Sequence, residues 1–97
     1  MAADDYYRGG TNLKPRPFEV RVDPVNGMLL PTHGISVFSR PDYLDQFGGA
    51  YRVTNVPEEL TIIRRGRDPN HFEIVPARTM TLDEYEAALG KIVLVPS

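Results

Sequence analysis

The chain has no cysteine and only two histidines among its 97 residues. Without cysteine, disulfide bonds, thiolate zinc sites and cysteine nucleophiles are excluded. His33 and His71 alone are too few to build a histidine-based metal centre, so we predict no metal. No apolar run approaches the roughly 20 residues of a transmembrane helix, and the acidic N-terminal sequence lacks the apolar core of a signal peptide. These features predict no membrane contact and a cytoplasmic location.

An excess of charge of one sign is also lacking, because 13 acidic and 11 basic side chains give a net charge of −2. A chain so close to neutral has no global field with which to hold nucleic acid. Its 41% hydrophobic and 25% charged residues are typical of a globular protein. The length predicts a single domain over residues 1–97, in which residues 1–5 are expected to be flexible.

Nine prolines and eight glycines divide the chain into short segments, which favours β-structure. The clearest alternation of apolar and polar residues lies at 18–23 and predicts a strand there. The segment 91–95 is continuously apolar and predicts a central or well-covered closing strand. Further strands are expected near residues 6–8 and over 35–38, 50–54, 61–64 and 71–75.

Two short helices are predicted as well. Thr81 precedes Glu84 by three residues, the spacing of a capping box, and Gly90 suits the end of that helix. Ser39 and Asp42 have the same spacing and predict a second helix over 43–47. Because strands and helices do not alternate regularly, we expect an α+β fold built on small, mainly antiparallel, twisted sheet structure.

Polar residues that could carry chemistry stand at the ends of the predicted strands. The sequence contains no phosphate-binding glycine loop and no nucleophile elbow. His71 and Glu73 would project from one face of their strand and could reach one pocket. Each candidate also has a structural explanation, such as a solvent-facing carboxylate or a hydroxyl bonded to the backbone. The candidates are Arg8, Thr32, His33, Ser36, His71 and Glu73.

Three segments, in this order and spacing, resemble one family. They are Thr-His-Gly-Ile-Ser-Val-Phe-Ser-Arg at 32–40, Val-Pro-Glu-Glu-Leu at 56–60, and His-Phe-Glu-Ile-Val-Pro-Ala-Arg-Thr-Met at 71–80. The segments are similar to motifs of ADP-ribosyltransferase-like toxins related to the type VI secretion effector called exported effector two. The resemblance extends from about Met28 to Leu89. It implies a pared-down ADP-ribosyltransferase-like fold.

The resemblance further implies a growth-inhibiting bacterial toxin that consumes NAD, as a transferase or a glycohydrolase. Such a toxin modifies a macromolecular target, which the sequence does not identify, and is neutralised by a cognate antitoxin or immunity protein. Folds of this kind carry an early strand in which an aromatic residue precedes Arg, as Tyr7 precedes Arg8 here. A guanidinium fork suits the dianionic pyrophosphate of NAD.

By the same resemblance, NAD is bound by Tyr7, Arg8, Thr32 and Ser36. Catalysis is assigned to Ser36, His71 and Glu73. None of the strands predicted late in the chain carries the Glu-x-Glu or Gln-x-Glu motif of classical ADP-ribosyltransferases. Either Glu73 replaces it, or His71 and Ser36 act without a glutamate, and the second arrangement is the one we expect.

Two alternatives stay open at this point. RNA 2′-phosphotransferases use the same architecture, and the basic loop with Arg64, Arg65 and Arg67 could hold RNA, although a solvated loop explains it too. A non-enzymatic domain that only binds a partner protein would explain why no catalytic glutamate motif is found.

Overall fold

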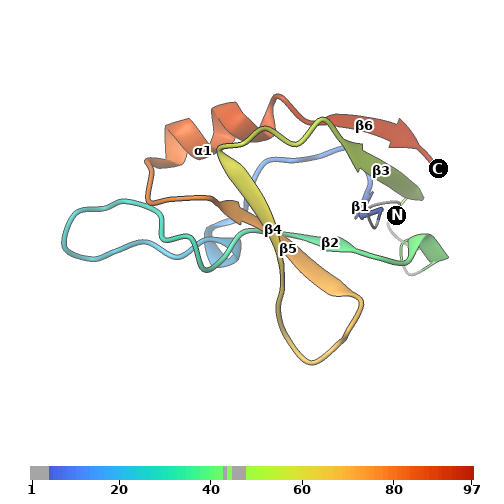
Figure 1. Cartoon of the computed structure of the whole chain (residues 1–97), viewed down its shortest axis with the longest axis horizontal. Coiled ribbons are helices and arrows are strands. Elements are labelled where there is room, and N and C mark those ends of the chain that lie inside the picture. Colours follow the sequence, from blue (N-terminus) through green and yellow to red (C-terminus); the bar gives the residue numbers. More distant parts are fainter. Residues whose placement is uncertain (1–4, 43, 45–47) are drawn as a thin grey trace.

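The computed structural model describes residues 5–42, 44 and 48–97, and its centre is a six-stranded sheet (Figure 1). The spatial order of the strands is β4-β5-β2-β1-β3-β6, and every neighbouring pair is antiparallel. The α+β class and the antiparallel sheet predicted from the sequence are therefore confirmed. The strands are β1 (Tyr7–Gly9), β2 (Ile35–Phe38), β3 (Ala50–Thr54), β4 (Leu60–Arg64), β5 (His71–Pro76) and β6 (Val93–Pro96).

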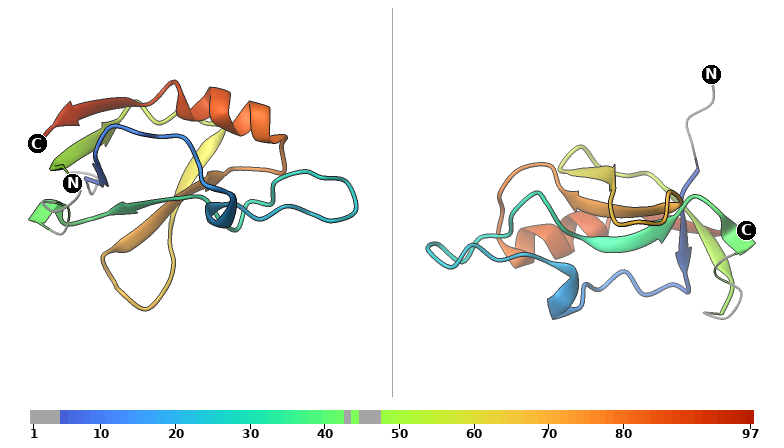
Figure 2. Two further views of the ribbon diagram at one scale, coloured as in Figure 1. Left: turned by 180° about the vertical axis from the view of Figure 1, so that it is seen from behind. Right: turned by 90° about the horizontal axis from the view of Figure 1, so that it is seen from below.

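The sheet is accompanied by a 3-10 turn η1 (Pro17–Glu19) and by the helix α1 (Leu82–Leu89). The predicted capping box of α1 is confirmed, because Thr81 Oγ1 accepts from the N–H of Glu84 at 3.1 Å and the Glu84 carboxylate accepts from the N–H of Thr81 at 2.9 Å. Figures 1 and 2 show α1 leading into β6 along one side of the molecule, whereas the β4–β5 hairpin extends to the other side.

Alternation along β2 separates the hydrophobic core from a polar face. Ile35 and Val37 are fully buried and belong to the core cluster together with Ile74 of β5. Ser36 and Phe38 alternate with them along the strand, so they project from the opposite face. The core is completed by Leu29, Leu60, Met80, Tyr85, Ala88, Leu89 and Ile92.

The hydroxyl of Tyr85 is inserted into the pairing of β2 with β5. Ile35 and Ile74 are register partners, yet the N–H of Ile35 donates to the Tyr85 hydroxyl at 3.1 Å, and that hydroxyl donates to the carbonyl of Ile74 at 2.5 Å. Gly34 leaves the space for this arrangement, since a Cβ there would lie 1.8 Å from the Ile74 carbonyl oxygen and 2.7 Å from the Tyr85 hydroxyl. The helix therefore fixes the β2–β5 pair through one buried side chain.

The prediction of a strand over residues 18–23 is wrong, because the chain forms a 3-10 turn at the start of this segment. Pro17 begins the turn η1, and the Glu19 carboxylate accepts from the N–H of Arg16 at 3.0 Å, which closes the chain locally. Phe18 is 77% exposed instead of facing a core. Only Val22 takes part in a β-bridge, with Leu29.

The closing strand was also expected in the wrong environment. β6 begins at Val93 rather than at residue 91 and lies at an edge of the sheet, and Val93 is 52% exposed. This strand pairs with β3 on one side, and its residue Leu94 packs against the core. Most of the predicted helix 43–47, and residues 1–4 of the segment expected to be flexible, lie outside the described residues.

Replacing Tyr85 with Phe should destabilise the protein by about 1–3 kcal/mol, because two buried backbone groups lose their partner. Burial raises the pKa of Tyr85 from 10.0 to about 12. Since the unfolded chain then loses the proton at lower pH than the folded one, wild-type stability should fall between pH 10 and 12. Urea titrations across this pH range should show that the free energy of unfolding declines less steeply with pH for Tyr85→Phe than for wild type. An equal decline in both proteins would contradict the buried hydroxyl; Tyr51→Phe on the half-buried strand β3 is the control.

Candidate functional site

The candidate site lies where β1 separates from β2. β1 pairs with β3 at three positions but with β2 only at Tyr7 and Phe38. At Ser36, two residues along β2 from Phe38, side chains rather than a neighbouring strand bond the backbone groups. The N–H of Ser36 donates to Glu19 Oε2 at 3.4 Å, and the carbonyl of Ser36 accepts from Arg8 Nη1 at 2.7 Å. The gap in the sheet is thus lined by charged groups.

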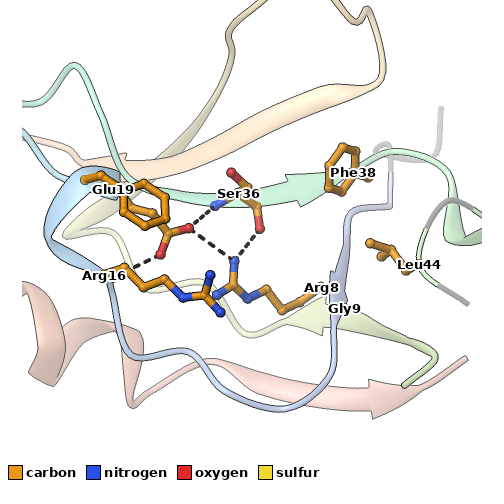
Figure 3. Close-up of a pocket in the computed structure, with 8 residues that line it drawn as sticks. Arg8, Gly9, Arg16, Glu19, Ser36, Phe38 and Leu44 are labelled. Atoms are coloured by element: carbon orange, nitrogen blue, oxygen red, sulfur yellow. Dashed lines mark hydrogen bonds and ion pairs between the residues drawn. The ribbon is translucent and has the colours of Figure 1, made fainter. Parts of the chain in front are cut away.

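A pocket of about 280 Å³ opens at this gap (Figure 3). Its wall combines charged side chains with the aromatic rings of Phe18 and Phe38, a composition that can hold a polar group beside a flat ring. The residues that line it are Arg8, Gly9, Arg16, Phe18, Glu19, Ser36, Phe38 and Leu44.

Arg8 and Glu19 form a largely buried ion pair in this pocket. Nη1 of Arg8 lies 3.7 Å from Oε2 of Glu19, and the two side chains are 13% and 10% exposed. Burial lowers the pKa of the Arg8 guanidinium, Glu19 raises it, and the neighbouring charge of Arg16 lowers it further. Figure 3 shows the Arg8 and Arg16 guanidinium groups side by side next to the Glu19 carboxylate. Two positive charges against one negative leave the pocket electropositive.

Ser36 and His71 are brought together on the polar face of β2 and β5. His71 Nε2 lies 3.0 Å from Ser36 Oγ, and His71 Nδ1 lies 2.8 Å from the carbonyl oxygen of Arg65. A carbonyl can only accept, so Nδ1 carries the proton and Nε2 of the neutral ring accepts from the serine hydroxyl. In Figure 3 that hydroxyl points away from Arg8, so the peptide groups of Ser36 face the charged pocket and its side chain faces β5.

Glu73 is placed opposite Ser36 in the register of β2 and β5, but its carboxylate serves other contacts. Oε1 accepts from the N–H of Gly34 at 3.0 Å, and Oε2 lies 3.3 Å from Nε of Arg65. The side chain is 12% exposed, so it is not the solvent-facing carboxylate that the strand pattern favoured. It fixes the loop before β2 to the β4–β5 hairpin.

The remaining predicted residues lie around the site rather than in its charged centre. Thr32 is exposed, its hydroxyl lies 2.7 Å from His33 Nδ1, and its carbonyl accepts from Arg65 at 3.4 Å. Burial lowers the pKa of His33, and the positive charge of Arg65 acts in the same direction. Tyr7 sits on β1 between Phe38 and Arg52, and its side chain projects to the face opposite Arg8.

Sequence reasoning missed Glu19, Arg16 and the two phenylalanines of the pocket. Phe18 and Glu19 were assigned to the strand expected over 18–23, so their side chains were not considered for the site. A signal was present, because Arg16 and Glu19 are three residues apart around Pro17, the spacing of a capped turn.

Comparison of the chain with protein-family models, curated proteins and solved structures gave no significant match. Over residues 5–42, 44 and 48–97, no group of three or more histidine, aspartate and glutamate side chains is placed to hold a metal ion. No helix in this part of the chain is long and apolar enough to span a bilayer.

The contact of His71 Nδ1 with the Arg65 carbonyl predicts a single tautomer for the neutral ring of His71. Two-dimensional ¹⁵N–¹H spectra of the imidazole should show a protonated Nδ1 and an unprotonated Nε2. Ser36→Ala should shift the Nε2 resonance strongly, because it removes the donor to that nitrogen. Ser39→Ala is the matched control, since the Ser39 hydroxyl donates to Asn70 Oδ1 at 2.9 Å. A ring protonated at Nε2 would contradict the assigned geometry.

Proposed function

We propose that this chain is an NAD-consuming bacterial toxin with an ADP-ribosyltransferase-like site, neutralised in its host by a cognate antitoxin or immunity protein. The proposal is supported by the three motifs at 32–40, 56–60 and 71–80 and by one structural observation. The observation is an electropositive pocket at the β1–β2 gap, where Arg8 is buried beside the peptide groups of Ser36. Its place of action would be the cytoplasm of the inhibited cell.

The pocket suits the anionic part of a dinucleotide. Arg8 and Arg16 offer charge-assisted hydrogen bonds to pyrophosphate oxygens, and Phe18 and Phe38 offer flat apolar faces to a ring. A volume of about 280 Å³ is at the small end for ligand sites, so most of a dinucleotide would extend across the mouth of the pocket. The residues present therefore fit a phosphate anchor rather than an enclosing cavity.

His71 does not line the pocket and the Ser36 hydroxyl faces β5, so these two side chains would supply polar groups for a sugar that lies outside the charged pocket. The Ser36 hydroxyl donates a hydrogen bond to Nε2 of the neutral His71 ring. The lone pairs of the Ser36 oxygen can therefore accept a hydrogen bond from a ribose hydroxyl. Breaking the bond between ribose and nicotinamide builds positive charge on the sugar. The dipole of the Ser36 hydroxyl, with its oxygen lone pairs toward the sugar, stabilises that charge. Glu73 is already bonded to Gly34 and Arg65, which supports the arrangement without a catalytic glutamate in β5.

The RNA alternative has weaker support from the basic loop. Nη1 of Arg64 donates to the carbonyls of Gly66 and Asp68, and Arg65 pairs with Glu73. These arginines shape the β4–β5 hairpin, so the basic loop already has a structural role.

The proposal is tested by incubating the purified protein with NAD and measuring free nicotinamide. Wild type should release nicotinamide, and its expression without an antitoxin should arrest growth of a bacterial host. Arg8→Lys keeps the charge but loses the planar fork. A lost charge-assisted hydrogen bond contributes about 1.5–3 kcal/mol, so cleavage should fall by roughly 10- to 100-fold.

Arg52→Lys is the matched control, because Arg52 lies on β3 and does not line the pocket. It should cleave NAD as wild type does. The proposal fails if folded wild-type protein releases no nicotinamide and bacteria that accumulate it grow normally. An Arg8→Lys variant as active as the Arg52→Lys control would remove Arg8 from the phosphate anchor.

A further inference from the structure

Glu19 occupies the position that an anionic ligand of Arg8 would need. Its Oε2 accepts from the N–H of Ser36 at 3.4 Å and lies 3.7 Å from Arg8 Nη1, while Oε1 accepts from the N–H of Arg16 at 3.0 Å. Figure 3 shows these contacts converging on one carboxylate. Backbone N–H groups and a guanidinium around one oxyanion are the donors that also bind phosphate.

Arg8 cannot be left without a counter-charge, because its side chain is only 13% exposed and burial lowers the pKa of its guanidinium. A buried cation needs a counter-charge close by. In the chain alone Glu19 supplies that charge, and a bound phosphate group could supply it equally well. Both anions cannot contact Arg8 together without strong mutual repulsion.

We propose that Glu19 is an internal competitor that holds Arg8 until a diphosphate group displaces its carboxylate. The identity of the ligand as a nucleotide rests on the proposed function, but the competition itself concerns only the diphosphate. Glu19 ends the three-residue turn η1, which is attached to the chain through the local contacts with Arg16. The carboxylate can therefore leave Arg8 without breaking any strand pairing.

Competition of this kind weakens the apparent affinity of the site for anions. When a site is competent only while an internal group is displaced, the apparent dissociation constant rises by the inverse of the competent fraction. Removing the carboxylate charge of Glu19 should therefore tighten binding. A carboxylate that instead helps to hold the ligand would have the opposite effect when it is replaced.

The test is titration of pyrophosphate into wild type, Glu19→Gln and Glu73→Gln by isothermal calorimetry. Glu73 is the matched control, since it is 12% exposed, pairs with an arginine and accepts from a backbone N–H, but does not line the pocket. Glu19→Gln should bind pyrophosphate at least about tenfold more tightly than wild type. Glu73→Gln should bind it as wild type does.

A second variant keeps the result interpretable if Glu19→Gln folds poorly. Glu19→Asp retains the charge but shortens the side chain, and should show a smaller gain in affinity. Adding Arg8→Gln to Glu19→Gln should abolish the gain. Unchanged or weaker pyrophosphate binding by both folded Glu19 variants, or an equal gain in Glu73→Gln, would overturn the competition.

The outcome is separable from that of the proposed function. Tighter pyrophosphate binding in Glu19→Gln without nicotinamide release from NAD in any variant supports the competition and rejects the NAD-consuming activity. Nicotinamide release by wild type together with unchanged pyrophosphate affinity in Glu19→Gln keeps the proposed function and rejects the competition.

Discussion

The peptide groups of Ser36 are the constraint on which the site depends. β1 meets β2 at one residue pair and then turns away, so the N–H and carbonyl of Ser36 need partners that no strand provides. Leaving such groups unpaired inside a protein costs about 1–3 kcal/mol each. Glu19 accepts from this N–H and Arg8 donates to this carbonyl. These hydrogen bonds bring two opposite charges into the gap between β1 and β2. The same geometry closes the fold and creates the proposed anion site.

The other edge of β2 is fixed from the opposite direction. Tyr85 reaches from α1 into the pairing with β5 and bridges Ile35 and Ile74. One residue further along the strand, the side chain of Ser36 meets His71. β2 is therefore held by a buried hydroxyl on one side and by an ion pair on the other. A rigid strand between these two contacts can present both a phosphate anchor and an oriented serine.

Local signals in the sequence predicted most of the fold. Alternation and turns gave β2 to β5, and the spacing of Thr81 and Glu84 gave the start of α1. The resemblance assigned catalysis to Ser36 and His71, and the structure brings their side chains into contact. The sequence could not place Glu19 in the pocket. Its alternation at 18–23 is typical of a strand, and the position of the Glu19 carboxylate depends on where β1 separates from β2. Strand order is likewise non-local, and for that reason the edge position of β6 was missed.

The most direct measurement of the central claim is an NMR titration of the wild-type protein with NAD, following the backbone N–H of Ser36 and the Nη–H groups of Arg8. Both groups contact the pocket, and both change partner if an anion enters it. The account predicts saturable shifts that are largest at these two signals and at Glu19. Shifts confined to the β4–β5 hairpin, or no saturable shift at any concentration, would contradict a nucleotide site in the β1–β2 gap.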